Sequence, residues 1–397
     1  MDPIPPANDS VERPSRILPV IVASQFAGTA LWFAVNAVAP DLQSALDLPK
    51  GAVSGLVSAV QLGFIVGTFV FALFTIADRL PARWVFCGCS LLGAATNAAV
   101  LLVGDYHSLL GLRFATGFFL AGIYPVGMKI AASWFEKGLG AALGFLVGAL
   151  VLGTAFPHLV RSLGPGLQWK MVIVVVSCVA VAGGLLMAFL VPVGPFLRAR
   201  PRFELASAFR IFRSADFRAA AFGYFGHMWE LYAFWTFVPI QLVLYQALHG
   251  AEFDVSLWSF IIIGSGVIGC VVGGLLSGRH GSGRVAVVQL AVSGTLCVVS
   301  PLLFVAPTPV FLAAMVLWGI TVVGDSPQFS TLNARNAPPE LVGTALTVVT
   351  CIGFAITIPS IQLMGHLAGT LHPRWLFLVL IPGPVFGLIA MRRLARS

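Results

Sequence analysis

Four side chains that are charged near neutral pH lie well inside long apolar stretches of this sequence: Arg113, Lys129, Glu230 and Asp325. His227 stands three residues before Glu230, so on a helix these two side chains share a face. An ionisable group near the centre of a bilayer costs at least about 2.5 kcal/mol, and such groups typically face a cavity, a partner or a proton path. A carboxylate held away from water beside an imidazole can exchange a proton near neutral pH. The pattern therefore favours proton coupling.

The elements that carry these residues are apolar segments long enough to cross a membrane. The chain of 397 residues is 58% hydrophobic and 10% charged, whereas soluble proteins carry about 25% charged residues. Runs of roughly 20 apolar residues, enough to cross a hydrocarbon core of about 30 Å, recur along the whole chain. We predict twelve spans: Leu18–Ala39, Ala52–Ala77, Trp84–Val103, Leu109–Ser133, Gly138–Ser162, Met171–Val193, Ala219–Tyr245, Leu257–Leu276, Val285–Val305, Val310–Leu332, Gly343–Leu367 and Trp375–Met391. The expected fold class is an all-α membrane protein.

The net charge of +8 reflects topology rather than nucleic-acid binding. If the N-terminus is cytoplasmic and the spans alternate, most of the 23 lysine and arginine residues fall in cytoplasmic segments. This asymmetry follows the positive-inside rule, and the reverse orientation would invert it. We expect a multi-pass protein of the cell (inner) membrane with both termini cytoplasmic, membrane lipid as its surroundings and no nucleic-acid partner.

The sequence divides into two halves around a basic segment. Residues 1–15 are polar and proline-rich and are expected to be disordered. Residues 16–193 and 219–397 each hold six spans, and residues 194–218 form a basic cytoplasmic loop between them. The loop that starts at Ala77 has a counterpart 200 residues later, at Ser277, and both place a pair of arginines between adjacent spans. Two such halves, with a substrate site where they meet, are a recurring transporter design.

The loop after the second span carries a motif that resembles the major facilitator superfamily, and the resemblance extends over essentially the whole chain. Asp78-Arg79 matches the signature Gly-x-x-x-Asp-Arg-x-Gly-Arg-Arg, although Phe74 replaces the first glycine and Pro81-Ala82 adds a residue before Arg83. The resemblance implies twelve helices in two pseudo-symmetric six-helix bundles that alternate access to a central site. It also implies that Asp78 caps the helix beginning at Gly343 in the outward-facing state; a loop held by local ion pairs is the alternative. The gating residues expected on this basis are Asp78, Arg79, Arg83, Arg279 and Arg284.

The fourth span contains a second matching element and a hint about substrate. Arg113 and Gly117 match the superfamily's Arg-x-x-x-Gly spacing, and the run from Tyr124-Pro125 through Lys129 to Trp134-Phe135 is similar to the anion-transporting branches, such as the nitrate and organophosphate carriers. Arg113 and Lys129 are roughly 24 Å apart along a helix and point in nearly opposite directions, so they cannot jointly hold one small anion. Each could instead be an interfacial anchor.

The fifth span gives less support to an exporter. Gly144 and Gly153 match part of the glycine-rich signature of the drug–proton antiporters, but Thr154 stands where that signature has proline. Small residues that allow close helix packing explain these glycines equally well. We therefore expect import of a small organic anion with protons, and keep proton-antiport efflux of a hydrophobic or cationic compound as the alternative, which two cavity carboxylates would suit.

In the superfamily's fold, the first, fourth, seventh and tenth helices line the central cavity, and the four buried charges fall on three of them. Glu230 is the expected proton carrier, tuned by His227, with Asp325 as a second coupling residue. Pro327 breaks the helix beside Asp325, which is tolerable where a cavity or neighbouring helix satisfies the freed carbonyls. The expected substrate-cavity residues are Arg113, Gln25, Asn36, Trp32, Trp229, Tyr232, Trp235 and Gln328, and one of the aromatic residues could face lipid instead.

Other interpretations remain open but have less support. His227 and Glu230 could bind a divalent metal, although no second histidine pair accompanies them, and Glu230 could pair with a cation on another helix without moving protons. A channel would need a filter, a sensor would need a soluble domain, and an enzyme would need a base for Ser326. We predict a monomeric secondary transporter rather than an enzyme, with no cofactor and no resident metal.

Overall fold

The computed structural model describes residues 14–49, 51–135, 139–164, 168–196 and 210–394. Most of the N-terminal segment 1–15 and the middle of the basic loop 194–218 lie outside the described residues, so the predictions for them are not tested. In the first half the helices are α1 (Ile17–Thr29), η1 (Asn36–Val38), α2 (Ala39–Leu46), α3 (Ala52–Leu73), α4 (Ile76–Arg79), α5 (Ala82–Ala98), η2 (Ala99–Leu102), α6 (Tyr106–Leu120), α7 (Tyr124–Trp134), α8 (Leu139–Ser162) and α9 (Trp169–Leu190). In the second half they are η4 (Ile211–Arg213), α10 (Ala215–His249), α11 (Val255–Gly264), α12 (Gly266–His280), α13 (Ser282–Leu303), α14 (Thr308–Gly324), α15 (Ser326–Asn336), η5 (Pro339–Leu341), α16 (Val342–Leu367), η6 (Pro373–Leu380) and α17 (Pro382–Met391).

The prediction of an all-helical membrane protein is confirmed. Within the described part of the chain, 11 helices are long and apolar enough to cross a membrane. The first predicted span differs, because α1 ends at Thr29 and turns over residues 30–35 separate it from η1 and α2. This segment is therefore a broken helix instead of the continuous one that its apolar sequence predicts.

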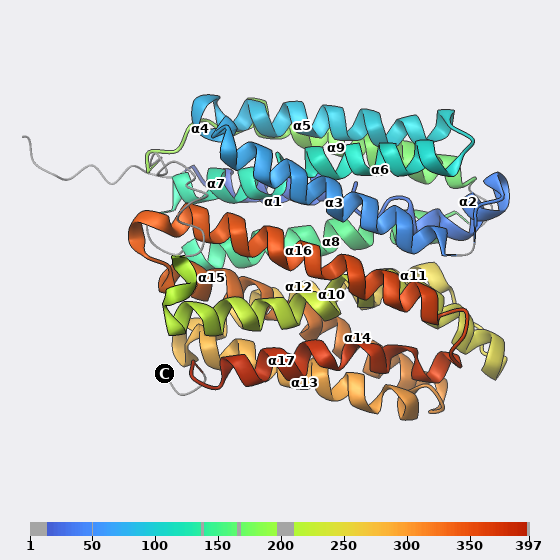
Figure 1. Cartoon of the computed structure of the whole chain (residues 1–397). Helices are drawn as coiled ribbons and strands as arrows, with labels where there is room; N and C mark the ends of the chain where they lie inside the picture. Colours follow the sequence, from blue (N-terminus) through green and yellow to red (C-terminus); the bar gives the residue numbers. More distant parts are fainter. Residues whose placement is uncertain (1–13, 50, 136–138, 165–167, 197–209, 395–397) are drawn as a thin grey trace, which may run out of the picture.

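The helices form two groups that lie against each other along their length (Figure 1). In the first group α3 packs on α6, and α9 packs on α1 and α5. In the second group α10 packs on α16 and α17, and α12 packs on α14. The groups meet mainly where α3 contacts α16 and where α8 contacts α11 and α12. The surface between them therefore runs through the middle of the molecule.

Two ends of the molecule are distinguished by their short helices (Figure 1). One end of the molecule carries α4 and the last described residues, and we call it the α4 end. The opposite end carries α2, and we call it the α2 end. Polar and basic loop residues, including exposed Arg79 and Arg279, lie at the α4 end. The long helices run between these ends, so the position of each buried charge can be described by how close it lies to either end.

Several spans are interrupted near their middle, and local sequence explains most of the breaks. The tenth span breaks at Asp325 because Pro327 has no N–H to continue the ladder, and α15 begins at Ser326. The fourth span breaks between Leu120 and Tyr124, just before Pro125. No proline or glycine lies between Ala30 and Val35 in the first span, so the break there depends on tertiary contacts.

Two glycines identified in the sequence are sites of close helix contact. A Cβ at Gly117 on α6 would collide with the Val60 carbonyl of α3, and a Cβ at Gly153 on α8 would collide with the Phe26 carbonyl of α1. Helix packing therefore accounts for both glycines, which removes them as evidence about the substrate.

Candidate functional site

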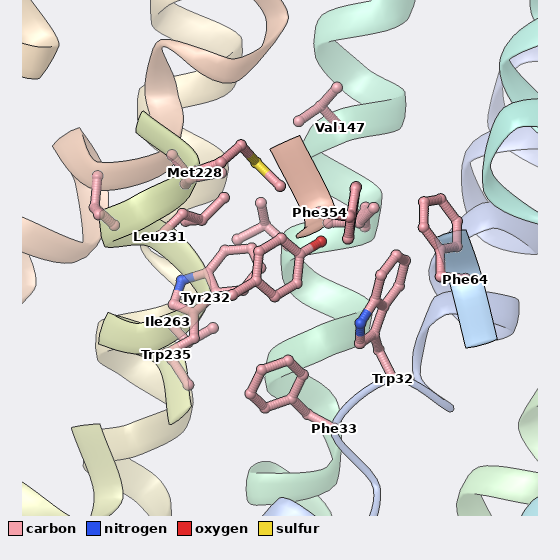
Figure 2. Close-up of a cluster of buried hydrophobic side chains, with 14 of the residues drawn as sticks. Trp32, Phe33, Phe64, Val147, Met228, Leu231, Tyr232, Trp235, Ile263 and Phe354 are labelled. Carbon is pink, nitrogen blue, oxygen red and sulfur yellow. The ribbon is translucent and has the colours of Figure 1, made fainter. Parts of the chain in front are cut away.

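Aromatic side chains from both groups of helices meet at the centre of the molecule (Figure 2). The Trp32 ring lies 5.6 Å from the rings of Tyr232 and Phe354 and 4.9 Å from the ring of Phe64, measured between centroids. Phe33 and Trp235 meet edge to face at 6.2 Å. We call these six residues, Trp32, Phe33, Phe64, Tyr232, Trp235 and Phe354, the aromatic cluster. Because its members come from both halves, any relative movement of the halves must rearrange it.

A small cavity of about 60 Å³ lies beside the aromatic cluster, toward the α4 end. Its wall includes cluster members from α10 and α16 and hydroxyl or amide groups from α10 and α15, such as Tyr224, Ser326, Ser330 and Asn333. None of the described residues that line it is charged. The chemistry of this lining matches an aromatic or apolar compound that carries a few hydrogen-bonding groups. Ligand pockets enclose about 300–1,000 Å³, so the two halves must move apart before the cavity can hold such a compound.

Arg113 contacts the break in the first span. Its Nη2 donates to the carbonyl oxygens of Leu31 at 3.2 Å and Trp32 at 2.6 Å, and its Nη1 donates to Asn97 Oδ1 at 3.2 Å. Asn97 Nδ2 in turn donates to Ser177 Oγ at 3.0 Å. The guanidinium, 2% exposed, thus satisfies carbonyls that an interrupted helix leaves free.

This arrangement holds Trp32 in place from two sides. Arg113 fixes the backbone of Trp32, and the indole Nε1 donates to Gln61 Oε1 on α3 at 3.1 Å. The cation therefore acts through the conformation of the broken helix, because its hydrogen bonds go to two main-chain oxygens and to Asn97, and Arg113 does not line the central cavity.

Glu230 lies among helices of the second half. Its Oε1 accepts from Trp318 Nε1 at 2.7 Å and from Cys297 Sγ at 3.4 Å, and its Oε2 accepts from Ser293 Oγ at 2.7 Å. The residue is 1% exposed. Each carboxylate oxygen thus has a donor on α13 or α14, which compensates the loss of water. Glu230 does not line the central cavity; it links α10 to two neighbouring helices.

His227 faces a different carboxylate. Its Nδ1 lies 2.9 Å from Asp325 Oδ1, and both side chains are 1% exposed. At this distance the imidazole and the carboxylate are in direct polar contact, and neither Asp325 oxygen has another side-chain partner among the described residues. His227 Nε2 is likewise unpaired. Asp325 stands at the break between α14 and α15, next to Ser326, which lines the central cavity.

A sequence model of the Major Facilitator Superfamily matches residues 21–361. The chain belongs to the Major Facilitator Superfamily. It is 27% identical over 365 residues to a chloramphenicol resistance protein of Streptomyces lividans, covering 86% of this chain and 88% of that protein. The superfamily consists of transporters, so this chain is a membrane transporter and not an enzyme.

Solved structures of the superfamily share the fold at low sequence identity. The nucleoside transporter NupG aligns with a TM-score of 0.72 and 14% identity, over 95% of this chain and 99% of that one. The human organic anion transporter MFSD10 aligns with a TM-score of 0.71 and 13% identity, over 96% and 100%. The E. coli fucose:proton symporter FucP aligns with a TM-score of 0.65 and 18% identity, over 97% and 100%. These likenesses establish the fold of this superfamily member.

The superfamily's signature loop makes an ion pair within the first half. Lys129 Nζ donates to Asp78 Oδ1 and to the Ala77 carbonyl. Asp78 also lines a cavity of about 100 Å³ together with Gly343 and Thr347 from the start of α16. Lys129, which belongs to the pattern that resembles the anion-transporting branches, therefore already has an anionic partner at the α4 end.

The remaining predicted gating residues lie at the same end of this superfamily fold. Arg79 is exposed beside Asp78, and partly buried Arg83 lies 5.8 Å from the Trp84 ring centroid. Arg279 and Arg284 are exposed at the end of α12 and the start of α13. Their gating role stays a prediction.

The predicted cavity residues lie in several different places. Trp32, Tyr232 and Trp235 belong to the aromatic cluster, whereas the Trp229 Nε1 donates to the Val379 carbonyl of η6 at 3.1 Å, on another face of α10. Asn36 lines a larger cavity at the α2 end. Gln25 and Gln328 are buried, at 0% and 2% exposure, but neither lines the central cavity.

Sequence reasoning did not identify several residues that complete the site. Gln61 and Phe64 come from the second span, Phe354 from the eleventh, and Ser293 and Trp318 hold Glu230. A polar residue within an apolar span was the available signal for Gln61 and Ser293. Phe64, Trp318 and Phe354 gave none, because aromatic residues are common in apolar helices.

Proposed function

We propose that this superfamily member exports an aromatic compound that is uncharged or cationic, in exchange for protons. The observation that carries the proposal is the aromatic cluster beside a central cavity with no charged residue in its described lining. Such walls favour a flat apolar body through stacking, and the hydroxyl and amide groups orient it.

The geometry favours this over the small organic anion that the fourth span suggests. Binding an anion centrally would require a free cation, yet Arg113 donates to the carbonyls of Leu31 and Trp32, and Lys129 pairs with Asp78. Releasing Arg113 would leave buried carbonyls without donors, at a cost of about 1–3 kcal/mol each. The chloramphenicol resistance protein, a relative over most of the chain, also supports an exporter.

We assign proton exchange first to the His227–Asp325 pair and only second to Glu230, which the sequence placed first. The His227 ring is the one side-chain partner that the described residues give Asp325, which lies at a helix break beside the cavity, so a proton there changes few existing contacts. Protonating Glu230 would weaken a site in which Trp318 can only donate. A proton on Asp325 and a compound in the cavity would then compete through the shared α14–α15 break.

The proposed orientation places the α4 end in the cytoplasm. That end carries the signature loop and the basic loops that the positive-inside rule assigns to the cytoplasm. A cytoplasmic compound would enter from the α4 end, reach the cavity beside Trp32 and leave at the α2 end when the two halves move.

The test is accumulation in proteoliposomes that contain the purified protein and an acidic lumen. Chloramphenicol, tetraphenylphosphonium and benzoate serve as uncharged, cationic and anionic aromatic probes. One pH unit is worth about 1.4 kcal/mol, so one proton per molecule would support roughly tenfold accumulation of a preferred probe. A proton ionophore should abolish it. Benzoate accumulation with an acidic exterior, without movement of the other two probes, would replace the proposal with anion–proton import.

A further inference from the structure

A cavity of about 610 Å³ lies between the two halves at the α2 end. The first half contributes residues of α2, the start of α3 and the end of α8, and the second half contributes residues of α10, α11 and α16. We call this cavity the outer chamber. Its apolar walls include Phe237 and Ile240. Its polar lining consists of hydroxyl and amide groups, such as those of Asn36, Ser256 and Ser259, together with two histidines. The chamber is about ten times larger than the central cavity.

His158 is the polar group that distinguishes this chamber from an apolar gap. It lies on α8, lines the chamber and is 2% exposed, and its Nε2 has no hydrogen-bond partner among the described residues. Leaving a buried polar atom unpaired costs about 1–3 kcal/mol. A ligand atom that hydrogen-bonds to Nε2 would remove this cost.

The aromatic cluster separates the chamber from the central cavity. Trp235 lines the central cavity, and the next two residues of α10, Thr236 and Phe237, line the chamber. Likewise Phe33 belongs to the cluster, and Asn36 lines the chamber one turn later. A molecule in the chamber is therefore screened from the central cavity by aromatic rings.

The rim of the chamber is tied to the helix that carries His158. Pro40 and Gln43 of α2 line the chamber, and Asp41 of the same helix accepts from Arg161 Nη2 at 3.0 Å. Arg161 follows His158 by about one turn of α8. One helix thus supplies both the polar contact and the attachment of the rim.

We propose that the outer chamber is a second ligand site, which binds an uncharged aromatic compound with hydrogen-bonding groups and uses His158 as its polar contact. The choice of compound rests on the proposed function, because the chamber lies on the exit side of the central site. Its neutral polar groups and apolar walls match the class of compound that the aromatic cluster would pass onward. Occupancy of the chamber does not require coupling to protons.

The test measures protection of a cysteine placed in the chamber. Ser256→Cys puts a thiol on the chamber wall, and Gln168→Cys puts a matched thiol on the same end outside it. Both are made with and without Trp32→Ala, which removes one ring of the aromatic cluster beside the central cavity. A membrane-impermeant thiosulfonate is applied with increasing chloramphenicol, and the wild-type chain gives the background from its six native cysteines. We expect chloramphenicol to slow modification at 256 in both backgrounds and to leave position 168 unchanged.

A His158 series assigns the polar contact. His158→Phe keeps an aromatic ring at this position but has no atom that can hydrogen-bond. We therefore expect the chloramphenicol concentration that gives half protection to rise about tenfold, whereas His158→Gln should recover most of the affinity. The unprotected modification rate at position 256 must match that of Ser256→Cys with His158 unchanged, which shows that the chamber is intact.

The outcomes separate this inference from the proposed function. If chloramphenicol does not protect Ser256→Cys, or if its protection disappears when Trp32→Ala is added, the second site is overturned. If chloramphenicol is transported but gives no protection, the proposal of an exporter still holds. Protection without transport supports the chamber site and rejects chloramphenicol as exported cargo. Equal protection in His158→Phe and wild type removes His158 from the site, and with it the proposal as stated.

Discussion

The two halves of the molecule bury their charges in opposite ways. In the first half Arg113 is a permanent cation whose hydrogen bonds go mainly to backbone carbonyls, and the same contacts fix the conformation of the broken first helix. In the second half Glu230 is held only by side chains, and Asp325 faces His227 at a helix break. The cation stays charged at any physiological pH, whereas carboxylates and imidazoles can exchange protons.

This difference suggests a division of labour between the halves. A guanidinium that never loses its proton is suited to hold the aromatic cluster, because its contacts persist through a proton cycle. A histidine and a carboxylate in contact can change charge while their helix break absorbs the movement. The comparison therefore assigns the anchoring of Trp32 in the aromatic cluster to the first half and proton exchange to the second, and each assignment can be tested separately.

The largest expected effect is on coupling, from Asp325→Asn. The amide keeps the shape of the side chain but cannot take up a proton, so accumulation driven by a pH gradient should fall to background. Exchange of labelled for unlabelled probe across proteoliposomes should continue, because exchange needs no net proton movement. The measurement compares both rates in one preparation.

His227→Gln serves as the companion variant to Asp325→Asn and should lower accumulation in the same direction. If Asp325→Asn accumulates the probe at wild-type levels in a pH gradient, the His227–Asp325 pair does not exchange the proton, and the proposed role of the second half is wrong.

Arg113→Met should produce the next largest effect, on stability and transport together. The variant leaves the Leu31 and Trp32 carbonyls buried without their donor, which should lower the free energy of unfolding by about 2–4 kcal/mol. Accumulation and exchange should fall by the same factor, since Trp32 loses its fixed position. Thermal unfolding in detergent gives the first quantity, and the two transport assays give the second.

Arg113→Lys is the matched control, because a lysine can reach one carbonyl and should recover part of the stability. Loss of accumulation with unchanged exchange and unchanged stability would place Arg113 in coupling and reverse the division between the halves.

The fold could be predicted from the sequence to a large extent, because a membrane imposes length and hydropathy on every span. The break at Pro327 was visible, since proline removes a backbone donor. The break after Thr29 was not, because its sequence is apolar and the donor to its free carbonyls is Arg113, more than eighty residues away in the chain. A contact between distant residues leaves no periodic signal in either segment.

The sequence predicted which residues belong to the candidate site better than it predicted which of them contact each other. His227 and Glu230 share a helix face by spacing, yet His227 contacts Asp325, and Glu230 contacts α13 and α14. Trp229, Tyr232 and Trp235 are close in sequence, but rotation along α10 turns Trp229 toward η6. Spacing gives relative angles on a helix, whereas the neighbours on each side are decided by packing between helices.

A smaller effect, on affinity, should separate two tryptophans of this site. Trp32→Ala removes the ring that stacks on Phe354, so binding of an aromatic probe should weaken about tenfold. Trp229→Ala loses a hydrogen bond to the Val379 carbonyl outside the cluster, so affinity should stay within about twofold of wild type. Equilibrium binding in detergent measures both. Equal weakening by the two variants would mean that the aromatic cluster is not the substrate site.

The smallest expected effect on coupling comes from Glu230→Gln. The glutamine Oε1 can still accept from Trp318, and its amide can donate to the Ser293 hydroxyl, so the three helices should remain linked. We expect accumulation within about twofold of wild type and a loss of stability of about 1–2 kcal/mol, because hydrogen bonds to a charged group are stronger than those to an amide. The same proteoliposome and unfolding assays apply. If Glu230→Gln abolishes accumulation while Asp325→Asn does not, the proton moves through the fully hydrogen-bonded carboxylate, and the number of donors around an acid is a poor guide to its role in this half.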